Sequence, residues 1–515
     1  MRRTIILLFT MIFSLACEKK VDLLVHNAKV YTSDDNYNDI TSFVVDEGKF
    51  IEVGGEELVE KYKSVSVVNA RGLPVFPGFI DSHCHLLSLG LKQFEVDLKG
   101  TKSFEEIVFK LKDYSLNKNL SVLRGAGWDQ NDWYKKDLPA KDSLDILFPN
   151  IPVVLSRIDG HAMLVNQKAL DMAGISLKTK ANGGEIVSSN GKLTGLIIDK
   201  PMELIEEIIP RYTESEKIKA LKTAEKICFE NGITTVDEAG LLKSDILLID
   251  SLQKNNLFDL RVYAMVANEK KSLEYFFKNG SIKNDRLNVS SIKVYADGAL
   301  GSRGAALKDS YSDKNNHYGS IIISIDSIEK LAIKALAHDF QMNTHAIGDY
   351  ANSEVLKIYN DILSDKSDPR WRIEHAQVIS NEDFSKFNEK IIPSVQPLHA
   401  TSDMYWAEER LGKSRIKGAY AYKDLLDWSG RLALGTDFPV EEVNPINTFY
   451  AAVSRKDLKQ YPAGGYQYEN ALSRREALLG MTIWGAYANF EDSLKGSISP
   501  GKYADFVILD RDIME

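Results

Sequence analysis

Two histidines separated by one residue, His83 and His85, follow the apolar segment that begins at Gly78. Residues two apart on a strand point to the same face, so both imidazoles would lie side by side where this strand ends. Imidazole nitrogens are common ligands of zinc and other divalent ions. The pair therefore predicts a metal site, although two polar residues at the mouth of a loop remain the simpler interpretation.

Four further polar residues close other apolar segments: Lys293, His345, His375 and Asp437. A buried lysine or aspartate is costly unless it is paired or bound to a metal. Only nine histidines exist, and four of them fall at these segment ends. Each residue alone would more often be structural, but one shared metal site explains them together.

The elements that must position these residues are short apolar segments separated by helical stretches. Several spacings are about 30 residues, the size of one strand–helix unit. Eight such segments predict an α/β fold, a parallel (β/α)8 barrel of the TIM type with its site at the carboxyl ends of the strands. The expected strands are Gly78–Asp81, Gly232–Glu238, Leu260–Val266, Ser291–Asp297, Met342–His345, Trp371–His375, Ile391–Gln396 and Arg431–Asp437.

The chain also divides into regions. The barrel is expected over 77–495, with a large insertion at about 86–231 after its first strand. The segments 18–76 and 496–515 are rich in β-branched and aromatic residues, as strands are. This pattern predicts that both chain ends share one small β-sandwich domain.

Composition narrows the class of protein. Among 515 residues, 64 Lys and Arg face 73 Asp and Glu, so the formal net charge is −9 and nucleic acid is not an expected partner. Three cysteines cannot form a disulfide framework or a four-thiolate zinc site. We expect a small-molecule substrate, and a homo-oligomer stays open.

The first seventeen residues have the pattern of a signal peptide. Arg2 and Arg3 precede an apolar run that is too short to span a membrane, and Cys17 follows small and apolar residues. The segment resembles a bacterial lipobox, so we expect an exported protein anchored in the cell envelope by lipid on Cys17. Plain secretion, with Cys17 incidental, is the alternative.

Longer motifs resemble one family. The segments 78–85 and 500–510, together with the order of the histidines, Lys293 and Asp437, resemble the amidohydrolase superfamily of metal-dependent hydrolases. Four more resemble its family 3 branch, which includes YtcJ-like proteins and N-substituted formamide deformylase. They are Gly127–Asp129, Arg157–His161, Asp297–Arg303 and Gln396–Asp403. The resemblance runs from about Val21 to Asp510.

The resemblance implies a role for each candidate ligand. His83 and His85 would hold the more buried metal, and His345 and His375 would hold a second one. Lys293, carboxylated by carbon dioxide, would bridge them. Asp437 would contact metal and water and act as general base and then acid. The ion would be divalent, most simply Zn²⁺, with one or two bound.

Further residues of these motifs are candidates for substrate contacts. His161, in the insertion, is the candidate for polarising the carbonyl group, although Arg157 and Asp159 could instead form a salt bridge that anchors the insertion. Trp128, Asp129, Arg157 and His399 are expected to contact substrate. Asp297 is expected to support the turn after its strand.

The expected reaction is hydrolysis of a non-peptide carbon–nitrogen bond, as in an amide or formamide. Alternatives with the same site are a cyclic amide, a deamination or an N-acyl amino acid as substrate. An alternative from another class is a solute-binding lipoprotein with a degenerate barrel. Relatives continue beyond the strand that ends near Asp510, so we expect either a truncated sequence or an incomplete β domain.

Overall fold

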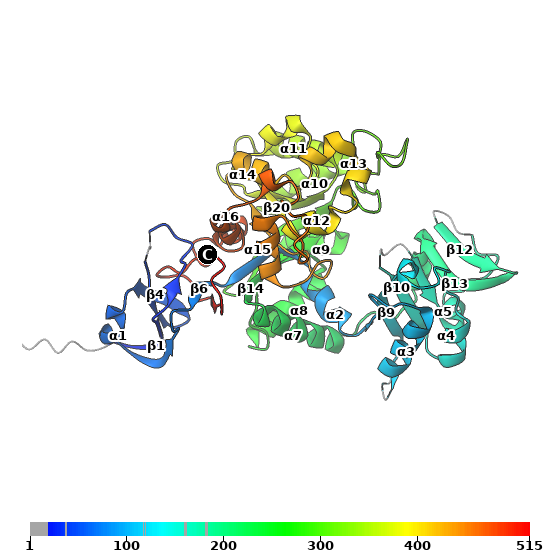
Figure 1. The fold of residues 1–515 in the computed structure, drawn as a ribbon, viewed down its shortest axis with the longest axis horizontal. Coiled ribbons are helices and arrows are strands. Elements are labelled where there is room, and N and C mark those ends of the chain that lie inside the picture. Colours follow the sequence, from blue (N-terminus) through cyan, green and yellow to red (C-terminus); the bar gives the residue numbers. More distant parts are fainter. Residues whose placement is uncertain (1–18, 37–38, 117, 119, 159–161, 181–183) are drawn as a thin grey trace, which may run out of the picture.

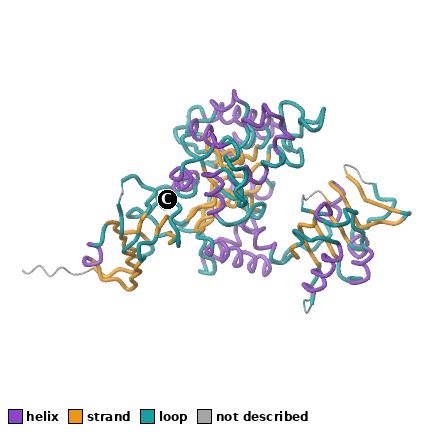
Figure 2. Tube along the Cα trace, viewed as in Figure 1, coloured by secondary structure: helices purple, strands orange, loops and turns teal. Residues whose placement is uncertain are grey.

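The computed structural model describes residues 19–515 except 37–38, 117, 119, 159–161 and 181–183. Cys17 and His161 therefore lie outside the described residues. Three bodies follow one another along the long axis in Figure 1: a β region built from the N-terminal segment, a central barrel, and the insertion on the far side. The tube in Figure 2 shows strands inside each body and helices wrapped around the central one.

The central body is the predicted barrel. Its strands form one parallel sheet in the order β21-β20-β19-β18-β17-β15-β14-β7, so all eight expected strands are confirmed. Their bounds are β7 Phe79–Cys84, β14 Ile233–Leu241, β15 Arg261–Ala267, β17 Leu287–Tyr295, β18 Gln341–Ala346, β19 Trp371–His375, β20 Ile391–Val395 and β21 Ala433–Leu434. A short strand, β16 (Ile282–Lys283), pairs with β17 at the edge.

The first and last barrel strands meet through single contacts rather than a ladder. The amide of Asp437 donates to the carbonyl of His83 at 2.7 Å, and the hydroxyl of Thr436 donates to Asp81 at 2.7 Å. Gly435 permits this approach, because a Cβ placed there would lie 2.5 Å from the amide nitrogen of His83. The seam of the barrel therefore brings Asp437 beside the His83–His85 pair.

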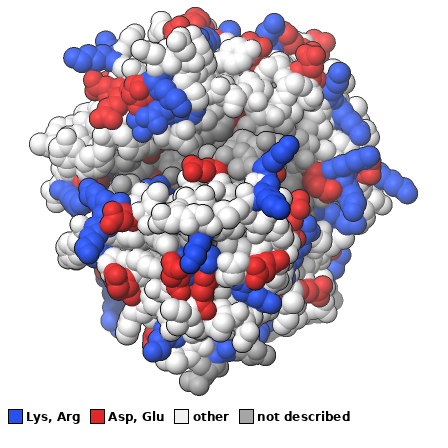
Figure 3. Space-filling model, turned by 90° about the vertical axis from the view of Figure 1, so that its right-hand side faces the viewer, with Lys and Arg blue, Asp and Glu red and all other residues white. Residues whose placement is uncertain are grey.

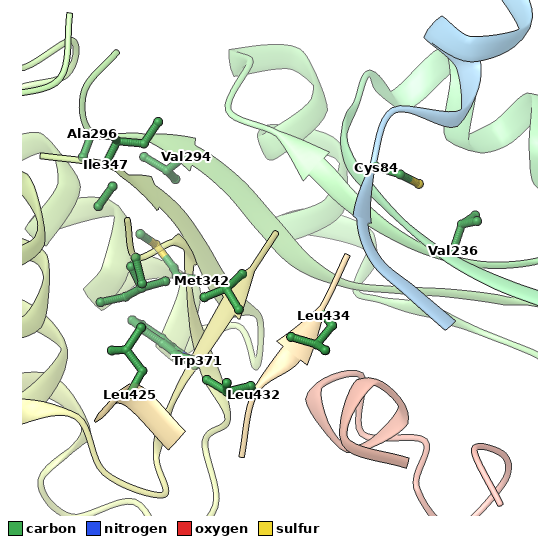
Figure 4. Close-up of a cluster of buried hydrophobic side chains, with 14 of the residues drawn as sticks. Cys84, Val236, Val294, Ala296, Met342, Ile347, Trp371, Leu425, Leu432 and Leu434 are labelled. Atoms are coloured by element: carbon green, nitrogen blue, oxygen red, sulfur yellow. The ribbon is translucent and has the colours of Figure 1, made fainter. Parts of the chain in front are cut away.

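Helices cover the outside of the barrel. Val236, Val294, Met342 and Trp371 point outward from the strands and pack in one apolar cluster with helix residues such as Leu425 (Figure 4). Burial of this layer drives the fold. The helices are α7 Glu214–Glu230, α8 Lys243–Lys254, α9 Lys270–Asn279, α10 Ile325–Ala337, α11 Asp349–Leu363, α12 Pro397–Asp403, α13 Ala407–Arg415, α14 Tyr422–Ser429, α15 Pro445–Ser454, α16 Arg474–Gly480 and α17 Ile483–Ala488.

The insertion forms a body with its own sheet and core. Its strands run in the order β12-β13-β11-β10-β9-β8, and apolar side chains such as Leu123, Leu155 and Leu164 fill the space under the helices. The bounds are β8 Val96–Asp97, α3 Phe104–Ser115, β9 Leu123–Trp128, α4 Asp142–Leu147, β10 Val153–Arg157, β11 Ala162–Val165, α5 Gln167–Met172, β12 Gly184–Ser189, β13 Lys192–Asp199 and α6 Glu203–Glu206.

Two helices carry the insertion. The short helix α2 (Leu86–Lys92) leads into it directly from His85, and α7 returns to the barrel. Where they meet, the Phe94 and Tyr212 rings lie 6.4 Å apart and the Tyr212 hydroxyl donates to Glu95 at 3.2 Å. Figure 1 shows the insertion standing off the barrel beyond this neck. On this side of the molecule, Lys and Arg side chains are interspersed with Asp and Glu (Figure 3).

Both chain ends build the remaining β region. One sheet has the order β4-β3-β1-β5, and a second has the order β2-β6-β22. In the second, β22 from the C-terminal segment pairs antiparallel with β6. The bounds are β1 Lys19–His26, β2 Lys29–Val30, β3 Ser42–Asp46, β4 Lys49–Gly54, α1 Glu57–Lys61, β5 Tyr62–Asn69, β6 Pro74–Pro77 and β22 Phe506–Ile508.

A search of the helices within the described residues found none with the length and apolar character that crossing a bilayer requires.

Candidate metal centre

Three buried side chains from distant parts of the sequence form the centre of the site. Donor atoms of His83, His375 and Asp437 all lie within 4.8 Å of one another. His375 and Asp437 have φ values of 72° and 63°, a conformation that residues other than glycine rarely adopt. Such backbone strain persists where the surrounding structure enforces it, and it concentrates at functional sites.

Two more of the predicted ligands lie around this centre. Nε2 of His85 is 3.3 Å from Oδ1 of Asp437, and the rings of His345 and His375 are 4.6 Å apart. Nε2 of His345 is buried, lies 3.5 Å from Oδ1 of Asp297 and makes no hydrogen bond among the described residues. A buried imidazole nitrogen without a hydrogen bond, beside other nitrogen and carboxylate donors, is typical of a metal ligand.

The electrostatic state of the histidines also fits a divalent cation. Burial lowers the pKa of His83 to about 4 and that of His345 to about 3. Burial likewise holds the pKa of His375 well below its usual value. These imidazoles are therefore neutral at pH 7, and neutral imidazole is the form that binds metal.

Lys293 lies at the same place, on β17. Its Nζ is 3.2 Å from Nε2 of His83, and its side chain is buried. Burial lowers the pKa of this amine to about 8, so roughly a tenth of it is neutral at pH 7. Only the neutral amine can react with carbon dioxide, so the surroundings of Lys293 fit the predicted carboxylation.

A chain of buried charges behind His83 was not predicted. The carboxylate of Glu374 accepts a hydrogen bond from Nδ1 of His83, while Nε of Arg372 lies 2.7 Å from Glu374. Arg372 also donates to Asp237 at 2.6 Å, and all three charged side chains have an exposure of 0%. The carboxylate fixes which nitrogen of His83 carries the proton, leaving Nε2 to face the site.

The alternation of β19 could have revealed this chain. On the expected strand Trp371–His375, residues 372 and 374 share one face. Two opposite charges on the inward face of a barrel strand indicate a buried pair. A similar partner fixes His375, whose Nδ1 lies 2.7 Å from Oε1 of Gln396, so this ring also has its Nε2 left for the site.

His399 connects Asp437 to a second acid. Its Nε2 lies 3.3 Å from Oδ2 of Asp437, and its Nδ1 lies 3.0 Å from Oε1 of Glu441. Burial opposes its protonation, but these two carboxylates raise the pKa of His399 well above its usual value. In return, contacts with His399 and His85 outweigh burial and hold the pKa of Asp437 well below its usual range. Glu441 was not predicted, since no motif marks it.

Two other acids hold the loops at the strand ends. Asp297 accepts from the amides of Ile347 at 3.0 Å and Gly348 at 2.8 Å, so it supports the turn as expected. Glu238 accepts from the amides of Leu86 and Leu87, and it thereby caps helix α2 immediately after His85. The first ligand pair is thus anchored from the neighbouring strand β14.

A cavity of about 360 Å³ opens above these residues. Its lining includes the apolar and aromatic side chains of Tyr295, Ile347, Trp406 and Val440 as well as polar ones. The six predicted ligands and His399 all line it, together with Gln377, Asp403 and Glu441. A metal ion, water and a small organic molecule fit a space of this size and lining.

The predicted substrate residues of the insertion lie elsewhere. Trp128 is buried in the core of the insertion, where its Nε1 donates to the carbonyl of Leu155 at 2.8 Å. Arg157 donates to Asp129 at 2.6 Å, again inside the insertion. None of these three residues is among the described residues that line the cavity. The insertion folds around its own core, and contact of these residues with substrate stays a prediction.

Comparisons with known proteins agree with this geometry. The model of the "Amidohydrolase family" matches residues 66–515. The chain is 34% identical over 509 residues to Protein LONG AFTER FAR-RED 3 of Arabidopsis thaliana, covering 95% of this chain and 87% of that protein. It is 32% identical over 500 residues to Putative amidohydrolase YtcJ of Bacillus subtilis (strain 168), covering 95% and 94%.

Two further relatives bear on the chemistry. N-substituted formamide deformylase of Arthrobacter pascens is 24% identical over 520 residues, covering 95% of this chain and 94% of that protein. A solved metal-dependent hydrolase of Pyrococcus horikoshii OT3 superposes with a TM-score of 0.83 at 27% identity, covering 96% of this chain and 98% of that one. From the family match, these relatives and the buried histidine–aspartate cluster, the chain belongs to the amidohydrolase family of metal-dependent hydrolases.

Proposed function

We propose that this protein hydrolyses a non-peptide carbon–nitrogen bond of the amide or formamide type. The observation that carries the proposal is the position of Asp437, which lies within reach of the histidine donors and lines the cavity. A carboxylate there can both complete a metal site and handle a proton. The relation to N-substituted formamide deformylase supports the choice of bond.

The residues divide the chemistry between them. His83, His85, His345, His375 and Asp437 would hold one or two divalent ions, most simply Zn²⁺, with carboxylated Lys293 as an anionic bridge. A divalent ion in this place supplies a Lewis acid and lowers the pKa of water towards ~7. Asp437 takes a proton from the attacking water and returns it to the departing nitrogen, which leaves poorly as an anion.

His399 holds Asp437 in position for this exchange. Nδ1 of His399 donates to Glu441 and, because the ring is protonated, its Nε2 also donates to Oδ2 of Asp437. The other oxygen of Asp437 then faces the histidine donors. His161, in a part of the insertion outside the described residues, stays the candidate for polarising the carbonyl group.

The test is turnover by metal-loaded protein. Protein prepared with Zn²⁺, Mn²⁺ or Co²⁺ is assayed for amine release from N-formyl and N-acetyl amines, for ring opening of cyclic amides and for ammonia release from aminated heterocycles. Reaction of the first group supports the proposal, whereas exclusive reaction of either of the others supports a cyclic amidohydrolase or a deaminase. Full metal occupancy without turnover of any carbonyl compound would favour a solute-binding protein.

We also propose export and lipidation on Cys17. The pattern of residues 1–17 supports it. Growth of expressing bacteria with labelled palmitate should label the wild-type protein and not Cys17→Ser, and equal labelling of both would refute the anchor.

A further inference from the structure

Negatively charged side chains outnumber positively charged ones in the described lining of the cavity. Asp403, Asp437 and Glu441 line it, whereas Lys293 and the protonated His399 are the cationic side chains among the described lining residues. Both cations are already engaged. Lys293 lies against His83, and His399 lies between the carboxylates of Asp437 and Glu441. Carboxylation would turn Lys293 into an anion, and Lys293 and Asp437 together would then offset the charge of one divalent ion.

Two carboxylates that line the cavity, Glu441 and Asp403, are not among the predicted metal ligands. Oε1 of Glu441 accepts from Nδ1 of His399 at 3.0 Å and from the hydroxyl of Ser402 at 2.6 Å. Asp403 accepts from the hydroxyl of Tyr420 at 2.8 Å and from Gln377 at 3.3 Å. The donors to Asp403 are neutral groups. The donors to Glu441 include the protonated His399, whose single positive charge is shared with Asp437.

Substrate orientation follows from Asp437. The departing nitrogen must reach Asp437 to be protonated, and one imidazole ring separates Asp437 from Glu441. A group attached one carbon from that nitrogen is therefore expected near the part of the cavity that Glu441 lines. Trp406, whose amide donates to the carbonyl of Asp403 at 3.0 Å, packs over Gly301 and lines the cavity together with Tyr295 and Val440.

An arginine that could have received a carboxylate is occupied elsewhere. Arg157, which the sequence suggested for substrate contact, is 2.6 Å from Asp129 within the insertion. An anionic substituent in the cavity would thus lose its hydration and meet two fixed carboxylates. Like charges brought together in this way cost several kcal/mol at an interface, so they act as a filter against the wrong ligand.

We propose that Glu441 and Asp403 make this site select amides whose nitrogen substituent is neutral or cationic, and reject those that carry a carboxylate beside the nitrogen. The inference rests on the proposed function and removes N-acyl amino acids from its alternatives. The aromatic and apolar wall of Tyr295, Trp406 and Val440 takes the uncharged part of the substituent, and it adds a face suited to a cation.

Three compounds that differ at one position test the proposal. N-formyl-2-phenylethylamine has no substituent beside the nitrogen, N-formylphenylalanine adds a carboxylate there, and N-formylphenylalanine amide adds the same bulk without charge. With metal-loaded protein at pH 8, we expect N-formylphenylalanine amide and N-formyl-2-phenylethylamine to be cleaved at similar kcat/KM. We expect the kcat/KM of N-formylphenylalanine to be roughly 100-fold lower. N-formylphenylalanine cleaved as fast as its amide, in either enantiomer, would overturn the proposal.

The variants Glu441→Gln and Asp403→Asn sharpen the test. The measured quantity is the ratio of kcat/KM between the amide and the carboxylate compound, so a general loss of activity does not obscure it. We expect each variant to narrow that ratio by about 10-fold, and Glu442→Gln, at an exposed position on the same loop, to leave it unchanged. An unchanged ratio in both cavity variants would remove the assigned role.

Failure of the proposed function gives a different result. In that case none of the three compounds is cleaved, and calorimetric binding of the same compounds to the metal-loaded protein replaces the kinetic ratio. Weaker binding of N-formylphenylalanine than of its amide, narrowed by Glu441→Gln, would still support the filter. Equal binding of the two compounds would overturn it.

Discussion

The interiors of the barrel and of the insertion are built from different residues. Inside the barrel, Asp237, Arg372 and Glu374 are fully buried and lead to the metal centre. Inside the insertion, the core is aliphatic and aromatic, and the ion pair of Arg157 with Asp129 is only partly buried. Charges are costly to bury, so the barrel carries them for the chemistry, whereas the insertion uses them to hold its own fold.

The largest expected effect comes from the charge closest to the reaction. Asp437→Asn should keep most of the bound metal, because the histidine donors remain. It should lower kcat/KM by about 10³-fold or more, because the amide side chain cannot accept the proton. Metal analysis and initial rates on the same preparation check this expectation, and a variant with near wild-type turnover would show that another group is the base.

Lys293→Ala tests the predicted bridging ligand on strand β17. Loss of the anionic bridge should remove metal and activity together, and a short carboxylic acid such as acetate or propionate should restore part of both. Metal content is measured after dialysis with and without the acid. Wild-type metal content in the variant without any acid would contradict the bridging role.

Glu374→Gln tests whether the buried charge chain serves the metal rather than the fold alone. Removing the charge that fixes His83 should weaken metal binding by about 10- to 100-fold, measured by competition with a chromophoric chelator. Glu442→Gln, the same change at an exposed residue, is the control. Unchanged metal affinity, with a lowered melting temperature, would assign the chain to stability only.

The smallest effect is expected in the insertion. Arg157→Met removes a partly exposed ion pair, and such pairs contribute about 0–1 kcal/mol. We expect kcat/KM for an N-formyl amine to change by less than about 3-fold, with wild-type metal content. A KM raised 10-fold or more at an unchanged melting temperature would instead place Arg157 at the substrate, and would end the contrast between the two interiors.

The barrel could be predicted from the sequence because its strands are clear apolar runs. Several of these runs end in polar residues, so both the strands and the ligands Lys293, His345 and His375 could be recognised. Glu374 and Arg372 lay within a predicted strand, where alternation alone could have placed them inside. Glu441 lay beyond any pattern, because its contact with His399 joins segments 42 residues apart.

The insertion shows where sequence reasoning met its limit. Motifs around Trp128 and Arg157 resembled those of a family, and this similarity suggested contact with substrate. A motif does not reveal which part of the protein packs around it, since that depends on the three-dimensional path of the whole insertion. Trp128 and Leu155 in fact stabilise a separate sheet.

Helix α2 has a consequence for how such proteins can diversify. It starts at the residue after His85, yet Glu238 on β14 holds its first amides, so the ligand is clamped from the barrel side. The residues after Lys92 are therefore connected to the barrel through this anchored helix and through α7. We expect that the insertion can change in length, surface and partners during evolution, or be replaced by grafting, without a shift in the register of the strands that carry the predicted ligands.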